Sequence, residues 1–405
     1  MSGFEEVTIG DARLILGDCR DVLPTLAPVS AVVTDPPYGL KFMGKGWDYD
    51  VPPTDLWALV LDRLLPGGHL LAFAGTRTQH RMAVRIEDAG FEIRDMLAWV
   101  YGSGFPKSLD VGKAIDKAAG VEREVVGAMP DRWTQKGGTY NFSTDRPQSQ
   151  IPVTGEAAAE AARQWDGWGT ALKPSFEPIT LARKPLVGTV AQNVQAHGTG
   201  GLNIDGCRIP VEQGDSRSGG FGYGLRPFQR GSVGYNTVTK GGETGRWPAN
   251  LIHDGSDEVV ALFPQSISAG TAGTGKSGTY GAFERKETGQ PVGFGDKGSS
   301  ARFFYCAKAA GAERGAGNDH PTVKPIALMR WLLTLVTPPG GVVLDPFLGS
   351  GSTGVAAADL GVRFVGIERE RRYFDIACER IARAQAQGQL LPHDAAPVLA
   401  QECLL

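Results

Sequence analysis

A short apolar strand that runs into two prolines constrains this chain most. Val32-Val33-Thr34 has the composition of a buried parallel strand, and Asp35-Pro36-Pro37-Tyr38 follows it directly. The prolines cannot donate to a strand ladder and hold the backbone extended. We therefore expect Asp35, Pro36 and Tyr38 at the carboxyl end of a strand, where open α/β sheets bind ligands. A carboxylate, a proline carbonyl and an aromatic ring suit a planar group with an exocyclic amine; a proline-rich turn without function is the alternative.

The two ends of the chain alternate as an α/β protein does, and the middle does not. Strands and helices alternate up to residue 100 and again from about residue 301, which predicts parallel βαβ units. Between them, helix and strand signals vanish over residues 213–246. Neither end makes a full doubly wound sheet alone, so we predict one sheet assembled from both. The predicted parts are residues 1–119 and 301–389 as the two halves of that domain, 120–300 as an inserted irregular lobe, and 390–405 as a loose tail.

Local signals predict several individual elements. Residues 7–16 alternate around a Gly10-Asp11 turn, which predicts a hairpin, and Asp18 is placed to cap a short helix. Ser108 is predicted to cap a helix that ends near Ala119, and a further helix is predicted over residues 156–165. In the second half we predict strands at 302–307, 341–345 and 363–368, and helices at 324–336, 352–360 and 371–384.

Composition bounds the class of protein. The chain is 41% hydrophobic and no apolar run reaches the length of a membrane helix, so we expect a soluble protein without a membrane partner. The first residues are acidic and lack the basic and apolar regions of a signal peptide. Five scattered cysteines argue against a disulfide framework and a zinc site, and favour a reducing cytoplasm. A net charge of −3 means that any surface for a polyanion must be local.

A second candidate site follows the predicted strand at 341–345. The glycine turn after Asp345 opens a helix whose first N–H groups are free for a ligand. Glu368 ends the next strand and can accept both hydroxyls of a ribose. With Glu368, the spacing Gly349-x-Gly351-x-x-Gly354 matches the dinucleotide fingerprint, so a nicotinamide cofactor is one interpretation.

Asp345 favours a different ligand. Its carboxylate stands at the strand end just before the turn, and it suits an ammonium group better than a pyrophosphate. S-adenosylmethionine carries such an ammonium and a ribose. Lys324, at the start of the preceding helix, is predicted to hold the carboxylate of this cofactor, whereas His320 is assigned no chemistry. A glycine-rich turn with a surface glutamate is the purely structural alternative.

Together these residues resemble a known family. Asp35-Pro36-Pro37-Tyr38, His320-Pro321-Thr322-Val323-Lys324-Pro325 and the segment from Asp345 to Gly351 resemble, in this order, the amino-group DNA methyltransferases of the β arrangement, whose catalytic half precedes the cofactor half. The resemblance covers roughly residues 5–106 and 300–385, and parts of the middle resemble phage- and prophage-associated members. It implies a Rossmann-like S-adenosylmethionine-dependent methyltransferase sheet with permuted motif order.

The resemblance also implies roles for residues. The cofactor would be S-adenosylmethionine, without a metal, and the partner double-stranded DNA. Asp35 and the Pro36 carbonyl would accept the two N–H groups of a base amine, and Tyr38 would stack on a base flipped out of the duplex. Trp99 or Tyr101 would supply the opposite wall or pack in the core. The implied cofactor-binding residues are Asp18, Lys324, Asp345, Phe347, Gly349, Gly351 and Glu368.

By the same resemblance, the inserted lobe of residues 120–300 would be the target-recognition lobe, but individual contacts to DNA are harder to assign. Arg217, Arg226 and Arg230 alternate with aromatic residues in a glycine-rich stretch that can order on a groove, although a solvated loop is an equal alternative. Lys41 and Lys45, in the loop after Tyr38, are the other candidates.

Asp at position 35 favours adenine N6 as the acceptor, because cytosine members of the family more often carry Ser there. Cytosine-N4 transfer is the nearest alternative. RNA or protein amide methylation is disfavoured because those enzymes typically carry Asn-Pro-Pro-Tyr, and an oxidoreductase or a DNA-binding protein without catalysis leaves the Asp35 motif unexplained. The DNA sequence read, homodimerisation and a cognate restriction nuclease are left open.

Overall fold

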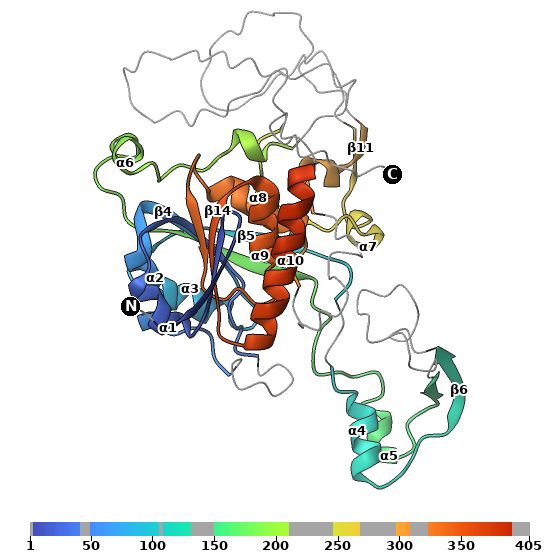
Figure 1. Cartoon of the computed structure of the whole chain (residues 1–405). Coiled ribbons are helices and arrows are strands. Elements are labelled where there is room, and N and C mark those ends of the chain that lie inside the picture. Colours follow the sequence, from blue (N-terminus) through green and yellow to red (C-terminus); the bar gives the residue numbers. More distant parts are fainter. Residues whose placement is uncertain are drawn as a thin grey trace, which may run out of the picture.

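One mixed sheet carries the architecture. The computed structural model describes residues 3–40, 49–104, 108–130, 150–209, 246–267, 297–307 and 323–390. Ten strands hydrogen-bond in the order β1-β2-β14-β13-β3-β4-β8-β5-β9-β12, and helices lie on both faces of the sheet (Figure 1). Its strands are β1 Glu5–Ile9, β2 Ala12–Leu16, β3 Val29–Thr34, β4 Leu64–Phe73, β5 Glu92–Val100, β8 Phe176–Arg183, β9 Leu251–His253, β12 Tyr305–Cys306, β13 Val342–Asp345 and β14 Arg363–Glu368.

The main remaining elements are α-helices and two short strand pairs outside the large sheet. The helices are α1 Cys19–Val22, α2 Thr54–Arg63, α3 Gln79–Asp88, α4 Val111–Ala118, α5 Glu160–Arg163, α6 Val190–His197, α7 Asp257–Val260, α8 Ile326–Val336, α9 Ser352–Leu360 and α10 Arg371–Leu390. Two separate hairpin-like pairs are β6 Val125–Pro130 with β7 Gln150–Thr154, and β10 Gln265–Ile267 with β11 Lys297–Ser299. Among the described residues, no helix is long and apolar enough to span a membrane.

The two ends of the chain share the centre of the sheet. β13 pairs in parallel with β3 and β14, and β14 pairs in parallel with β2, so strands from the second half stand between strands of the first. The prediction of one α/β sheet built from both ends is therefore confirmed. Since parallel strands end at the same edge, Asp35, Asp345 and Glu368 are brought to one edge of the sheet.

Each face of the sheet has its own hydrophobic core. All six residues of β3 are buried, as expected for a strand covered on both sides. Trp331 and Leu332 of α8 pack into one core together with parts of α9 and α10. Trp57 and Val60 of α2 pack into the other, with Met82 of α3. These two layers fix the strand ends from both sides.

The middle of the chain enters the sheet, which corrects the predicted boundary of the inserted lobe. β8 lies antiparallel between β4 and β5, and β9 pairs in parallel with β5. β8 is buried from Pro178 onward and mostly apolar there, apart from Thr180 and Arg183. It pairs with the edges of both β4 and β5. Residues 120–300 are thus not one separate lobe, and β5 is not the parallel neighbour of β4.

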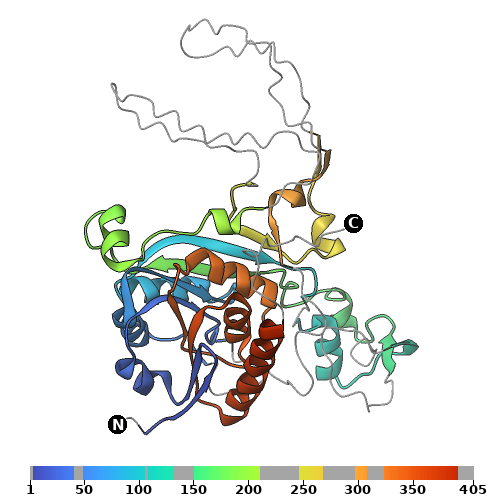
Figure 2. The same cartoon turned by 45° about the horizontal axis from the view of Figure 1, so that its top comes forward.

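A small lobe leaves the sheet between β5 and β8. It holds α4, α5, β6 and β7 and lies away from the sheet in both views (Figures 1 and 2). The N–H of Tyr101 donates to the carbonyl of Ser175 at 2.9 Å, which closes the neck of this excursion. We call residues 103–173 the neck lobe.

Most local predictions are confirmed, with two corrections in the neck lobe and one near residue 300. The strand predicted at 302–307 is only the two residues of β12, because a 3-10 helix over Ser300–Phe303 precedes it. The hairpin at the N-terminus forms, and the Asp18 side chain accepts from the N–H of Arg20 and caps α1. The cap of α4 is Asp110, which accepts from Lys113 N; the Ser108 hydroxyl instead accepts backbone N–H groups from residues 170 and 171. The helix predicted at 156–165 shortens to the four residues of α5.

Candidate functional site

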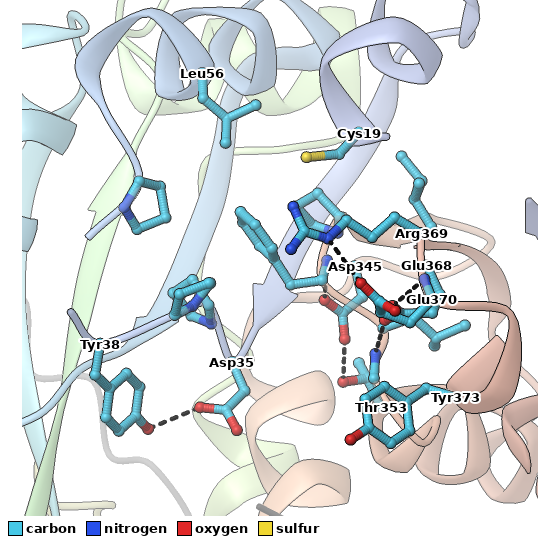
Figure 3. Close-up of a pocket in the computed structure, with 18 of the residues that line it drawn as sticks. Cys19, Asp35, Tyr38, Leu56, Asp345, Thr353, Glu368, Arg369, Glu370 and Tyr373 are labelled. Carbon is cyan, nitrogen blue, oxygen red and sulfur yellow. Dashed lines mark hydrogen bonds and ion pairs between the residues drawn. The ribbon is translucent and has the colours of Figure 1, made fainter. Parts of the chain in front are cut away.

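A cavity of about 490 Å³ lies at the carboxyl ends of the central parallel strands. It is lined by residues from both halves of the chain, with Asp35 and Tyr38 at one side and Asp345 and Glu368 at the other (Figure 3). Of the predicted site residues that the structure describes, the cavity is lined by Asp18, Asp35, Pro36, Tyr38, Lys324, Asp345, Phe347, Gly349 and Glu368. Two sites predicted from separate motifs therefore form one continuous pocket.

At the Asp35 side, four ionisable or hydroxyl groups meet. The Lys324 ammonium lies 2.9 Å from Asp35 Oδ2 and 2.9 Å from Glu177 Oε2, and donates to the Tyr38 hydroxyl at 3.1 Å. The Tyr38 hydroxyl lies 2.7 Å from Asp35 Oδ1 and 2.9 Å from Glu177 Oε2. We call Asp35, Tyr38, Glu177 and Lys324 the tetrad.

The tetrad keeps Lys324 charged and Tyr38 neutral. Burial alone lowers the pKa of Lys324, but the carboxylates of Asp35 and Glu177 outweigh burial and raise that pKa above its ordinary value. Burial and the same two carboxylates raise the pKa of Tyr38 well above its ordinary value. With one cation and two carboxylates, the tetrad leaves net negative charge facing the cavity.

This arrangement changes the expectation for Lys324. Its three N–H groups have partners in Asp35, Glu177 and Tyr38, so in this geometry none is left for the carboxylate of a cofactor. The side chain is 6% exposed, and its ammonium also lies 4.9 Å from the centre of the Phe73 ring. Lys324 thus belongs to the Asp35 side of the cavity.

Asp345 is held at the other side by three donors. The hydroxyls of Thr34 and Thr353 each donate to it at 2.6 Å, and Phe347 N donates at 3.1 Å. Burial raises the pKa of Asp345 to about 6, although these hydrogen bonds oppose the rise. A cation in the cavity would find here a carboxylate that is ionised at neutral pH and fixed in position.

Glu368 is oriented by backbone N–H groups. Its two carboxylate oxygens accept from Gly349 N and Glu370 N, both at 2.8 Å. Burial raises its pKa. Each oxygen retains acceptor capacity, so the carboxylate can take the two hydroxyls of a ribose. The Phe347 ring, next to the Trp57 ring, adds an apolar wall.

Gly351 serves the fold rather than the cavity wall. It caps α9 at φ +83°, and an added Cβ would lie 2.9 Å from the Cβ of Ala377 in α10. Close approach of α9 and α10 therefore requires glycine there.

Other predicted residues lie elsewhere or outside the described ranges. Trp99 and Tyr101 contact each other at 4.9 Å between ring centres, and neither lines the cavity. The DNA-contact candidates Lys41, Lys45, Arg217, Arg226 and Arg230, and also His320, lie outside the residues that the structure describes.

Glu177 was not predicted. Parallel strands present their last residues at the ligand edge, but β8 is antiparallel and presents its first residues there. Glu177 is the second residue of β8, and its side chain is only 20% exposed. The available signal was an acidic residue near the start of a mostly apolar strand. This signal points to the cavity only when the direction of the strand is known.

The donor set fits S-adenosylmethionine better than a dinucleotide. The buried ionisable side chains that line the cavity beside the glycine turn are the carboxylates Asp345 and Glu368, whereas Arg20 and Arg369 on the cavity rim are about half exposed. The buried guanidinium of Arg380 hydrogen-bonds the Ser350 side chain and is not part of the cavity lining. A pyrophosphate beside α9 would face two buried negative charges, but an ammonium and a ribose would be accepted. Within the described ranges, no three His, Cys, Asp or Glu side chains are grouped as a metal site requires.

Comparison with known proteins shows which protein family this chain resembles. Residues 284–379 match the family model described as "DNA methylase" (N6_N4_Mtase). The chain is 48% identical over 69 residues to the Type II methyltransferase M2.DpnII of Streptococcus pneumoniae, covering 17% of this chain and 25% of that protein. It is 40% identical over 77 residues to M2.LlaDCHI of Lactococcus lactis subsp. cremoris, covering 19% and 28%. The chain thus spans about a quarter of the length of these curated relatives.

Similar solved structures match over most of the chain at low identity. One is the M1.HpyAVI–SAM complex, with 16% identity, a TM-score of 0.39, and coverage of 91% of this chain and 99% of the other. Another is the PvuII DNA methyltransferase (cytosine-N4-specific), with 13% identity, a TM-score of 0.42, and coverage of 96% and 89%. The family match and the curated relatives confirm the resemblance to amino-group DNA methyltransferases; they do not bear on the phage-like resemblance.

Proposed function

We propose that this chain, whose resemblance to the amino-group DNA methylases is now established, is a DNA methyltransferase that moves a methyl group from S-adenosylmethionine to the N6 amine of adenine. One observation carries the proposal. The Asp35-Pro36 acceptors and the Asp345–Glu368 cofactor acceptors line the same cavity, although they stand more than 300 residues apart in the chain.

The cofactor would be held by groups already in position. Glu368 would accept the ribose hydroxyls, Asp345 would face the ammonium, and Phe347 would provide an apolar surface for the adenine ring. Asp18 lines the same end of the cavity and can accept from the cofactor's base. When bound, S-adenosylmethionine supplies an electrophilic methyl group on its sulfonium.

The Asp35 side would prepare the acceptor. An exocyclic base amine is a weak nucleophile because its lone pair is delocalised into the ring. The Asp35 carboxylate and the Pro36 carbonyl can accept its two N–H groups, which favours a pyramidal nitrogen with a directed lone pair. After transfer the nitrogen carries a positive charge, and Asp35 or water can accept its proton.

Tyr38 would bind the extruded base. Its ring stands beside Asp35, held from behind by Gly75, where a Cβ would lie 3.2 Å from the ring. Stacking on an aromatic ring contributes about 1–3 kcal/mol per base, comparable to the few kcal/mol needed to extrude the base. The double-stranded DNA around the base would be contacted by residues outside this cavity.

The test is identification of the methylated product. Purified protein would be incubated with labelled S-adenosylmethionine and DNA from a methylation-deficient host, and the DNA digested to nucleosides for mass spectrometry. N6-methyl-2′-deoxyadenosine among the nucleosides supports the proposal, since Asp35 favours adenine. N4-methylcytosine would retain the enzyme class and overturn the base. Absence of methylation, with binding of NAD in place of S-adenosylmethionine, would overturn both.

A further inference from the structure

Glu177 belongs to β8, a strand of the middle segment, and its side chain lies beside Asp35 and Tyr38. It pairs across the ladder with Trp99 of β5, and its carboxylate points into the tetrad. Side-chain exposures of 17% for Asp35, 20% for Glu177 and 6% for Lys324 show that the three charges share a largely desolvated space. In such a space each charge affects the others strongly.

The tetrad contains one more acceptor than its hydroxyl can satisfy. Tyr38 has a single O–H, and it lies within hydrogen-bond distance of both Asp35 Oδ1 and Glu177 Oε2. When this proton points to Glu177, Asp35 Oδ1 is free to accept an N–H from a substrate. When it points to Asp35, that oxygen is already occupied.

The Lys324 ammonium is likewise shared between the carboxylates of Asp35 and Glu177. Lys324 lies 2.9 Å from an oxygen of each carboxylate, so neither has it alone. A carboxylate that holds a buried ammonium alone is a weaker acceptor, because the cation already neutralises its charge. Glu177 therefore competes with Asp35 for the Tyr38 proton and holds part of the Lys324 charge.

We propose that Glu177 is a positioning residue that keeps Asp35 available as the acceptor for the substrate amine, by sharing Lys324 and taking the Tyr38 hydroxyl. The inference deepens the proposed methyl transfer and rests on it. Glu177 touches neither substrate nor cofactor in this role. Among the described residues, the charged or titratable groups that act on Asp35 are Tyr38 on its own loop, Lys324 before α8, Glu177 on β8 and Asp345 on β13.

A thermal double-mutant cycle tests the sharing without any activity. Glu177→Gln or Asp35→Asn each leaves Lys324 with one carboxylate, whereas the double variant leaves a buried ammonium with none. We expect the loss of Tm in the double variant to exceed the sum of the two single losses by about 5 °C or more. Additive losses would overturn the sharing, whether or not the protein is a methyltransferase.

A pH–rate profile tests the effect on Asp35. With Glu177→Gln, we expect the single-turnover rate of methyl transfer near pH 7.5 to fall about tenfold while S-adenosylmethionine affinity is unchanged. The acid limb of the profile should move to lower pH, because the substitution removes one negative charge from the largely desolvated space of the tetrad. A profile that coincides with wild type, in a wild-type protein that does methylate DNA, would overturn the inference and leave the proposed function standing.

Glu92→Gln is the matched control. Glu92 also pairs with a cation across the β5–β8 ladder, at 2.5 Å from Arg183, but at the other end of β8. This substitution removes the same charge from the same pair of strands. Combined with Asp35→Asn, it should give a loss of Tm equal to the sum of the two single losses. The acid limb of the pH–rate profile should stay in place. A shift of the acid limb equal to that of Glu177→Gln would assign the effect to general charge and overturn the positioning role.

Discussion

Asp35 is the residue on which the proposed chemistry depends most directly. Asp35→Ala removes the carboxylate but leaves Tyr38, Glu368 and the rest of the cavity. We expect methyl transfer to fall by about 10²–10³-fold, the scale of losing a polar contact made in the transition state. Affinity for S-adenosylmethionine, measured by calorimetry, should change little. Transfer at a near-normal rate would contradict the mechanism.

Tyr38 separates the roles of ring and hydroxyl. Tyr38→Ala removes the stacking surface, so DNA binding and rate should fall together, by about 1–3 kcal/mol in the binding term. Tyr38→Phe keeps the ring and frees Asp35 Oδ1 from its hydroxyl neighbour, so it should retain substantial activity. Fluorescence anisotropy with a DNA duplex and transfer assays on both variants measure this difference. Equal losses in the two variants would argue against stacking.

The raised pKa of Asp345 gives cofactor binding a pH dependence. An acid whose pKa rises to about 6 in the fold is ionised above that pH and neutral below it. Only the ionised form attracts an ammonium, so affinity for S-adenosylmethionine should fall about tenfold between pH 7 and pH 5. Calorimetry at the two pH values measures it.

Asp345→Asn is the control for that pH effect. The amide oxygen can still accept from one of the two threonine hydroxyls, the other hydroxyl can turn to accept from the amide NH2, and the side chain carries no charge at any pH. The variant should bind more weakly at pH 7 and lose most of the pH dependence; the part that remains belongs to Glu368, whose pKa burial also raises. An unaltered tenfold fall in the variant would show that Asp345 does not face the ammonium.

At the scale of elements, the junction of α9 with α10 depends on Gly351. Gly351→Ala places a Cβ at positive φ and 2.9 Å from Ala377, so we expect a loss of about 2–3 kcal/mol in unfolding free energy. Gly340→Ala has a similar φ of +68° but open space around the new Cβ, and should cost only about 1 kcal/mol. The urea unfolding midpoints of the two variants measure this difference. Equal losses of unfolding free energy would mean that α9 and α10 move apart enough to accept the added Cβ.

Elements with a clear period and clear ends were predictable. The helix predicted at 352–360 and the strand predicted at 363–368 coincide with α9 and β14, since glycines bound the helix and an apolar run defines the strand. The place of β8 was not predictable, because a buried and mostly apolar strand fits a parallel or an antiparallel position equally well. Glu177 was missed for the same reason. Lys324 was placed in the site from the sequence, but its partner Glu177 was not, because that contact depends on β8.

At the scale of the molecule, two distant segments complete one sheet while a third leaves it. Because β13 and β14 stand between β2 and β3, the cavity exists only when both ends of the chain have folded together. The neck lobe is different, since it leaves and rejoins at strands that are already paired, Val100 opposite Phe176. Its polar contacts are largely internal: Asp116 accepts from Arg123 at 2.6 Å and from Ala159 N at 2.8 Å.

The neck lobe should therefore be removable without loss of the cofactor site. Replacing residues 103–173 by Asn-Gly joins β5 to β8 through a two-residue hairpin turn in the existing register. We expect a folded protein that binds S-adenosylmethionine within about twofold of wild type. A second variant that also removes β8 should fail to fold, because β4 and β5 both lose their ladder. If the shorter deletion also abolishes cofactor binding, the lobe is part of the sheet domain. If cofactor binding persists while methyl transfer to DNA is lost, the lobe acts on the nucleic acid, as expected for part of a segment that reads the target.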